Sequence, residues 1–184
     1  MSWKSTPTDK SSQIGEALSN RQLTRALEKH LPANVFGGVW ARNHLDILRP
    51  TSYPKAYVIN TDDEDQPGRH WTVFVCEGPD HITFFDFYGC PPDVYGEAFR
   101  RFVQDLQLHY QPRWIQGLES VVCGHYCLYY LCHRFHVPSP HALSVFGHVY
   151  RVNDILVEQW ARDHFPDLQK DQKKGQRCRC FFAL

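Results

Sequence analysis

The stretch from Trp114 to Leu131 constrains the fold more than any other part of the chain. Its front half predicts a short loop, and its aromatic-rich apolar back half predicts a buried helix. Cys123 then falls in the first turn of that helix. Backbone N–H groups and the helix dipole stabilise negative charge there, which lowers a cysteine pKa from about 8.5 toward neutrality. The pattern fits a catalytic thiolate, and it also fits a small buried packing residue.

A candidate general base lies upstream, at the start of a predicted strand. His70 precedes the apolar run Trp71 to Cys76, which is typical of a strand buried on both faces. A turn at Gly78-Pro79-Asp80 separates it from a second strand that carries one carboxylate, Asp86. An acid among aromatic residues is costly to bury without a cationic or hydrogen-bonding partner. If the two strands form a hairpin, the start of the first lies beside the end of the second, which pairs His70 with Asp86.

A fourth polar side chain, Gln116, lies shortly before Cys123 in the predicted loop. Its amide could share a substrate oxyanion with the Cys123 backbone N–H. Gly124 lacks a Cβ, so we expect open space beside the sulfur for a substrate backbone. The chain therefore contains, in order, a base, an orienting acid, an oxyanion donor and a nucleophile.

This order and its local sequence resemble the adenovirus maturation protease family (adenain) and, more distantly, the ubiquitin-like-protein-specific cysteine proteases of the same clan. The resemblance implies that Cys123 is the nucleophile, His70 the general base and acid, and Asp86 the orienting carboxylate. Gln116 and the Cys123 N–H would form the oxyanion hole. One departure is that the best-known adenains carry Glu at the position of Asp86. The matching motifs are His70-Trp71, Phe85 to Gly89, Ile115-Gln116-Gly117, Cys123-Gly124 and Cys127.

The resemblance also implies an α+β fold, with a central mixed, mostly antiparallel sheet flanked by helices and the nucleophile at the N-terminus of a buried central helix. The 184 residues are 42% hydrophobic and 14% aromatic, enough for one core, so we expect a single protease domain over residues 1–184. Within it, residues 1–10 should be loose and residues 169–184 form a basic tail.

Hydrophobic spacing and turn residues predict the remaining elements. Gly37-Gly38 is expected in a loop, with a self-cleavage site as the alternative, and the acidic run Asp62 to Asp65 is expected in a solvated loop. Strands are expected at Tyr57–Asn60 and Tyr110–Ile115. Helices are expected at Ser12–His30, capped by Ser11 or Ser12 and ended by Pro32, at Asp93–His109, from Cys123 to about Phe135, and after Ala142.

Charge and cysteine content restrict the compartment and the partners. The formal net charge is zero, so the whole chain has no electrostatic attraction to nucleic acid or membranes. Seven cysteines without paired spacing and no secretory signal predict free thiols in a reducing compartment. That compartment would be the virion and host nucleus if the chain is viral, and otherwise the cytoplasm or nucleus; we do not expect secretion. No apolar run reaches membrane length, and we expect a monomer.

We expect no metal and no required cofactor. The metal-capable residues around Cys123, which are His125, Cys127, Cys132 and His133, share one predicted helix, whereas structural zinc sites usually join two separated segments.

Two function classes remain. The first is a cysteine endopeptidase, a maturation protease that cleaves viral or mobile-element structural precursors at glycine-containing sites. The second is an isopeptidase that removes ubiquitin-like modifiers. Val122 favours the first, because the modifier proteases usually carry Asp before the nucleophile.

The resemblance further implies activation by DNA or by a short viral peptide tethered through a disulfide. No cysteine lies between Tyr95 and Ile115, where that tether would be expected. The basic tail, which holds Cys178 and Cys180, could instead act in cis on the enzyme body or contact DNA. The alternative is a solvated tail with no such role.

Overall fold

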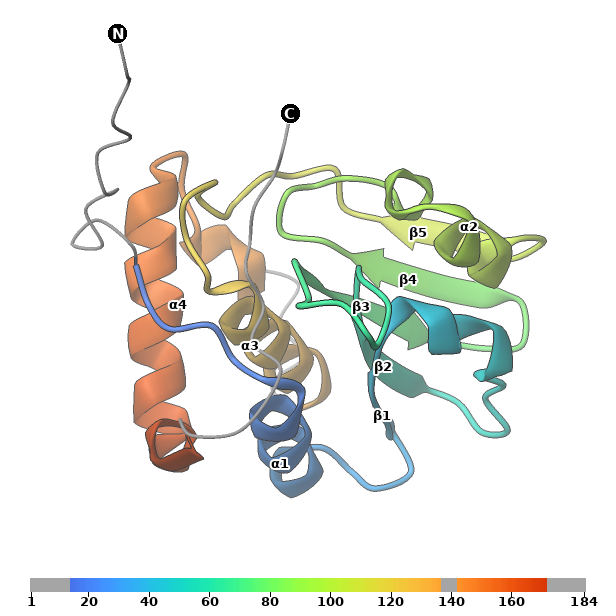
Figure 1. Cartoon of the computed structure of the whole chain (residues 1–184), viewed down its shortest axis with the longest axis horizontal. Coiled ribbons are helices and arrows are strands. Elements are labelled where there is room, and N and C mark those ends of the chain that lie inside the picture. Colours follow the sequence, from blue (N-terminus) through green and yellow to red (C-terminus); the bar gives the residue numbers. More distant parts are fainter. Residues whose placement is uncertain (1–13, 137–141, 172–184) are drawn as a thin grey trace, which may run out of the picture.

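The computed structural model describes residues 14–136 and 142–171. A five-stranded sheet in the order β1-β2-β3-β4-β5 forms the middle of the molecule (Figure 1). The two outer pairs, β1 with β2 and β4 with β5, are parallel, and the inner pairs are antiparallel. The predicted α+β class with a mixed sheet is confirmed. The strands are β1 (Phe36–Trp40), β2 (Lys55–Asn60), β3 (Trp71–Cys76), β4 (His81–Phe85) and β5 (Gln107–Tyr110).

In the described part of the chain, four α-helices and several short 3₁₀ turns surround the sheet (Figure 1). The 3₁₀ segments are η2 (Arg42–Ile47), η3 (Pro92–Tyr95), η4 (Ala142–Val145) and η5 (Pro166–Asp171). The α-helices are α1 (Asn20–His30), α2 (Glu97–Val103), α3 (Cys123–Phe135) and α4 (Tyr150–His164).

The sheet separates two hydrophobic cores. Val73 and Val75 of β3 belong to the larger core, which is shared with α1, α3 and α4. Phe74 faces the opposite way, into a smaller core shared with η2 and α2, where its ring lies 5.6 Å from that of Phe99. All six residues of β3 are buried, as the uninterrupted apolar run predicted. Because both faces of β3 are covered, its register is fixed and the position of His70 at its start is well defined.

The first helix is shorter than predicted, and the predicted cap is wrong. It begins at Asn20 rather than Ser12, and Ser19 is its N-cap. The Ser19 hydroxyl accepts the Gln22 N–H at 3.3 Å while the Gln22 side chain accepts the Ser19 N–H at 2.9 Å, a capping box. Upstream, Gly15 has a φ of +77°, a left-handed conformation that interrupts helical continuation. Ser11 and Ser12 lie outside the described residues.

The predicted helix Asp93–His109 is also wrong in extent. Gly96, with a φ of +101°, separates η3 from α2, and the chain turns again at Asp105 with a φ of +63°. Residues 107–110 consequently form β5, so the strand predicted over 110–115 is displaced toward the N-terminus. Apolar spacing continues through both breaks, which is why it predicted a single helix.

Two predicted loops also differ from the structure. Gly37-Gly38 lies within β1 rather than in a loop, and the pairing with β2 shifts register between Phe36 and Gly38. A Cβ added to Gly37 would lie 2.3 Å from the Tyr57 ring, so the glycine accommodates that ring. In the acidic run, Asp62 is buried rather than solvated, and it accepts a 2.7 Å hydrogen bond from Arg69.

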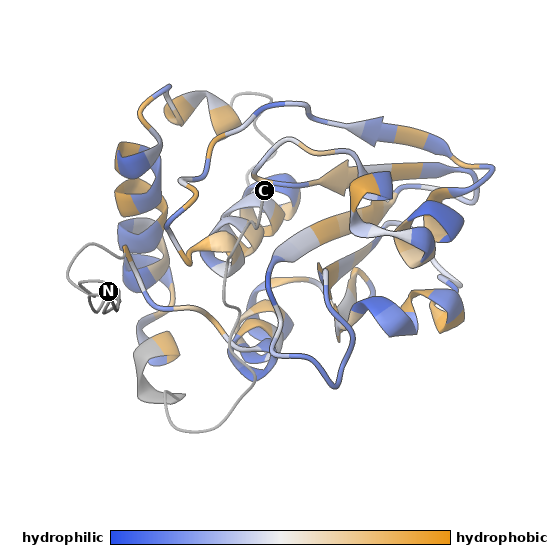
Figure 2. Cartoon of the chain, turned by 45° about the horizontal axis from the view of Figure 1, so that its top comes forward, coloured by the Kyte–Doolittle hydropathy of each residue, from blue (hydrophilic) through white to orange (hydrophobic). Residues whose placement is uncertain are grey.

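The C-terminal half contains the two longest helices. The predicted bounds of α3 are confirmed at both ends. Hydrophobic and hydrophilic residues alternate along α4, the long helix at the left of Figure 2. No helix in residues 14–136 or 142–171 combines the length and the apolar character needed to cross a bilayer.

Candidate active site

The hairpin of β3 and β4 brings His70 and Asp86 together, as predicted. Val73 lies opposite Phe85 in this antiparallel pair, so the start of β3 is next to the end of β4. His70 Nε2 lies 2.5 Å from Asp86 Oδ1, and both side chains are buried. The other oxygen, Asp86 Oδ2, accepts the backbone N–H of Cys90 at 2.9 Å. Both carboxylate oxygens therefore have partners, as a buried acid requires.

Aromatic rings surround this pair. The Tyr88 ring centroid lies 4.8 Å from that of His70, and the Tyr95 centroid lies 6.0 Å from it. Burial, and then the charge of Asp86, raise the pKa of Tyr95, so its hydroxyl stays neutral. Sequence reasoning placed Asp86 among aromatic residues but missed Tyr95, because it comes from η3, beyond a proline-rich turn. The Cys90 N–H was missed because backbone donors have no signature in side-chain patterns.

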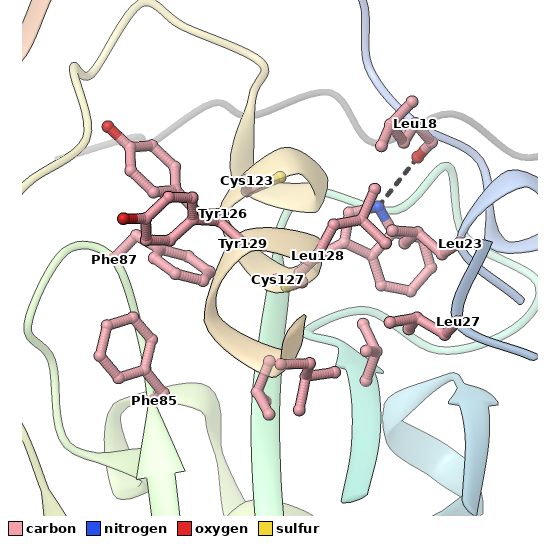
Figure 3. Close-up of a cluster of buried hydrophobic side chains, with 14 of the residues drawn as sticks. Leu18, Leu23, Leu27, Phe85, Phe87, Cys123, Tyr126, Cys127, Leu128 and Tyr129 are labelled. Carbon is pink, nitrogen blue, oxygen red and sulfur yellow. Dashed lines mark hydrogen bonds between the residues drawn. The ribbon is translucent and has the colours of Figure 1, made fainter. Parts of the chain in front are cut away.

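Cys123 is the first residue of α3, the position predicted for the nucleophile. Figure 3 shows it at the start of the helix, with Cys127 one turn further along, and both are fully buried. The first N–H groups of an α-helix have no partner within the helix, so this end can hold an anion. The predicted open space beside Gly124 is wrong: a Cβ added there would lie 3.0 Å from Leu18 Cβ, so Leu18 occupies that space.

Leu18 connects the helix end that carries Cys123 to the strand end that carries His70. The Trp71 indole N–H donates to the Leu18 carbonyl at 3.0 Å, the dashed bond in Figure 3. Because Trp71 follows His70 and Gly124 follows Cys123, one residue contacts the immediate neighbours of both. The residue Leu18, just before α1, thus lies against both the start of α3 and the start of β3.

The loop that carries Gln116 is held against the segment that directly follows β4 and contains Asp86 and Phe87. The backbone N–H groups of Ile115 and Gln116 both donate to the Phe87 carbonyl, at 2.9 and 3.2 Å. The Phe87 ring stacks on Tyr126 of α3 with centroids 4.9 Å apart. The segment after β4 that carries Asp86, the Gln116 loop and helix α3 therefore pack on one another.

Gln116 has a side chain suited to donate to an oxyanion. Its Nε2 donates to Ser120, lying 3.2 Å from Oγ and 3.4 Å from the carbonyl oxygen. An amide nitrogen carries two hydrogens, so a second can point at a substrate oxygen. Its Oε1 is buried and has no hydrogen-bond partner among the described residues.

The four predicted residues are almost fully enclosed. Their exposed fractions are 0% for Cys123 and Gln116, 2% for Asp86 and 4% for His70. A cavity of about 560 Å³ lies elsewhere, between η2 and α2, and is lined by none of them. Hydrogen bonds and packing, and not a large cavity, therefore define the candidate site.

Burial disfavours the charged forms of two other thiols, Cys76 and Cys132, and of the His125 ring. Burial raises the pKa of both Cys76 and Cys132 to about 12, so these thiols stay protonated. Burial lowers the pKa of His125 to about 4, which keeps that ring neutral near pH 7. No cluster of three or more metal-capable side chains occurs in residues 14–136 and 142–171.

Sequence comparison and structural comparison give different results for this chain. No family model and no curated protein matches the chain. Among solved structures, the central domain of the uncharacterized Lpg1148 protein from Legionella pneumophila is similar, with 14% sequence identity and a TM-score of 0.48. That match covers 85% of this chain and 100% of the other. A similarity this distant carries no functional argument.

Proposed function

We propose that this chain is a cysteine protease in which Cys123, His70, Asp86 and Gln116 perform the chemistry. The observation that carries the proposal is the buried 2.5 Å contact between His70 and Asp86 beside a helix whose first residue is cysteine. A carboxylate buried this deeply against an imidazole is costly to maintain, and function is a good reason for its presence. The adenain resemblance of the local motifs supports the same assignment.

Each residue has one role in the proposed reaction. His70 Nε2 is directed at Asp86, so the other ring nitrogen, Nδ1, takes the proton from the Cys123 thiol. The thiolate attacks the peptide carbonyl carbon, and the carbonyl oxygen becomes an oxyanion. The second Gln116 N–H and the Cys123 backbone N–H stabilise that charge.

The remaining steps return the enzyme to its starting state. Imidazolium His70 gives its proton to the leaving amine as the C–N bond breaks, which leaves an acyl group on sulfur. His70 then takes a proton from water, whose oxygen attacks the thioester, and returns that proton to the Cys123 sulfur. Asp86 stabilises the imidazolium throughout without being protonated itself.

We infer a maturation endopeptidase that cleaves structural precursor proteins at glycine-containing sites. Cys123 is fully buried, so little room is left for side chains of the substrate. Substrate glycines add no side-chain volume next to the scissile bond. The covering segments must also move to admit substrate, since the site is closed. An isopeptidase for ubiquitin-like modifiers is the second candidate, because it too requires a glycine pair to reach the nucleophile.

The test is a cleavage assay with two substrate sets. Glycine-containing peptides and linear or isopeptide-linked modifier fusions are incubated with the purified chain and with Cys123→Ala. We expect peptide cleavage by the first protein alone. Cleavage confined to modifier fusions would favour the isopeptidase, and equal cleavage by Cys123→Ala would overturn the catalytic assignment. DNA or a viral peptide added to the same assay tests activation.

A further inference from the structure

We propose that Asp154 and Asn153 of α4 are positioning residues for Gln116. Both side chains are polar and only 1% exposed. Buried polar groups are stabilised only when their hydrogen bonds are made, so the partners of such a pair indicate what it does. This inference rests on the proposed protease function.

The two side chains bind the backbone on either side of Gln116. Asn153 Nδ2 donates to the Ile115 carbonyl at 2.9 Å, directly before Gln116. Directly after it, the Gly117 N–H donates to Asp154, with nitrogen–oxygen distances of 3.0 and 3.3 Å. Rotation of the Gln116 backbone would break at least one of these bonds.

The nucleophile helix joins the same network. The Tyr126 hydroxyl lies 3.0 Å from Asp154 Oδ1 and 3.2 Å from the Ile115 carbonyl. Tyr126 lies one turn after Cys123, so the clamp fixes the loop relative to the helix that carries the sulfur. The same hydrogen-bond network therefore sets the position of Gln116 relative to the helix that carries Cys123.

Gly117 allows this close approach. A Cβ added there would lie 2.7 Å from Asp154 Oδ2, closer than real Cβ contacts occur. The glycine and the aspartate therefore fit as a pair, and neither contacts the reacting atoms. Misplacing a catalytic group by about 1 Å can cost about 100-fold in rate, so a clamp of this kind affects turnover.

The test compares two substitutions of Asp154. Asp154→Leu has nearly the same shape but offers no acceptor to Gly117 or Tyr126. Asp154→Asn keeps an acceptor for the Gly117 N–H and a polar partner for Tyr126. We expect Asp154→Leu to lower kcat by about 10- to 100-fold with little change in KM, and Asp154→Asn to recover most of the rate.

A double substitution separates positioning from general destabilisation. If Asp154 acts through Gln116, Asp154→Leu should have little further effect on kcat in a Gln116→Ala background. If the loss of kcat in the double variant equals the product of the losses in Asp154→Leu and Gln116→Ala, the proposal is overturned. Leu45→Ala removes a fully buried side chain from the core on the other face of the sheet, and it shows what destabilisation alone does to kcat.

Hydrogen exchange gives a readout that does not depend on catalysis. The Gly117 amide should exchange slowly in the unmodified chain and in Asp154→Asn, and much faster in Asp154→Leu. Unchanged protection in Asp154→Leu would overturn the clamp even if no substrate were ever found. An inactive chain with the predicted exchange pattern would instead count against the proposed protease function alone.

Discussion

The buried ring of His125 makes the fold sensitive to acid. His125 is 6% exposed, and burial lowers its pKa from 6.5 to about 4; Glu158 and Cys123 oppose that shift, and Arg162 adds to it. Between these two pKa values the unfolded chain binds a proton that the folded chain excludes. The stability that the neutral His125 ring allows is therefore fully present above about pH 6.5, and it is lost as the pH falls toward about 4.

The size of the effect follows from the shift. A difference of about 2.5 pKa units corresponds to about 3 kcal/mol in total, of which about 2 kcal/mol is lost between about pH 7 and about pH 5. His125→Gln keeps a polar side chain of similar length that does not titrate. The free energy of unfolding of that variant should therefore lack this loss of about 2 kcal/mol between about pH 7 and about pH 5. The expectation does not depend on how stable the variant is near pH 7.

Urea unfolding near pH 7 and near pH 5 measures the effect. The stability of the unmodified chain relative to His125→Gln should fall by about 2 kcal/mol between the two pH values. His109→Gln, at an exposed position in β5, controls for the removal of a histidine. A difference that stays constant, or that changes in the opposite direction, would refute the argument.

Four further predictions concern the proposed activity and the tail. Cys123→Ala should abolish cleavage and thiol labelling at that position while circular dichroism stays unchanged, and full activity would remove the assignment. Asp86→Asn should lower kcat at least about tenfold because His70 loses its counter-charge, and an unaltered pH–rate profile would count against the pair. Peptides with valine in place of the glycines before the scissile bond should not be cut; equal rates would contradict the expected specificity. Truncation after Leu168 should keep peptide cleavage but weaken any DNA binding, which should also fall steeply with salt; identical, salt-insensitive binding would contradict a role for the tail.

The sequence predicted the pairing of His70 with Asp86 because local rules determine it. A short turn joins two apolar strands, so the register follows from the turn and brings His70 beside Asp86. The start of α3 was equally accessible, since its aromatic-rich apolar segment follows shortly after the polar residues Glu119 and Ser120. The extents of the other helices could not be predicted from the sequence. Residues with a positive φ, such as Gly15, Gly96 and Asp105, interrupt the helices although the apolar spacing continues through them.

Long-range polar contacts escaped sequence reasoning for a different reason. Asp154 lies 37 residues after Gly117, and on an amphipathic helix an aspartate is usually assigned to the solvent. Only the packing of α4 against α3 shows that it is buried. Leu18 was likewise unpredictable as a neighbour of Gly124, so the space beside the sulfur was misjudged.

The contacts of α4 have a consequence for biosynthesis. A ribosome makes Leu18, His70, Asp86 and Cys123 well before it reaches Asp154, so an incomplete chain can contain every residue proposed to react without the clamp on the Gln116 loop. Under the proposed function, full activity would then require that α4 has been made and has packed against the Gln116 loop.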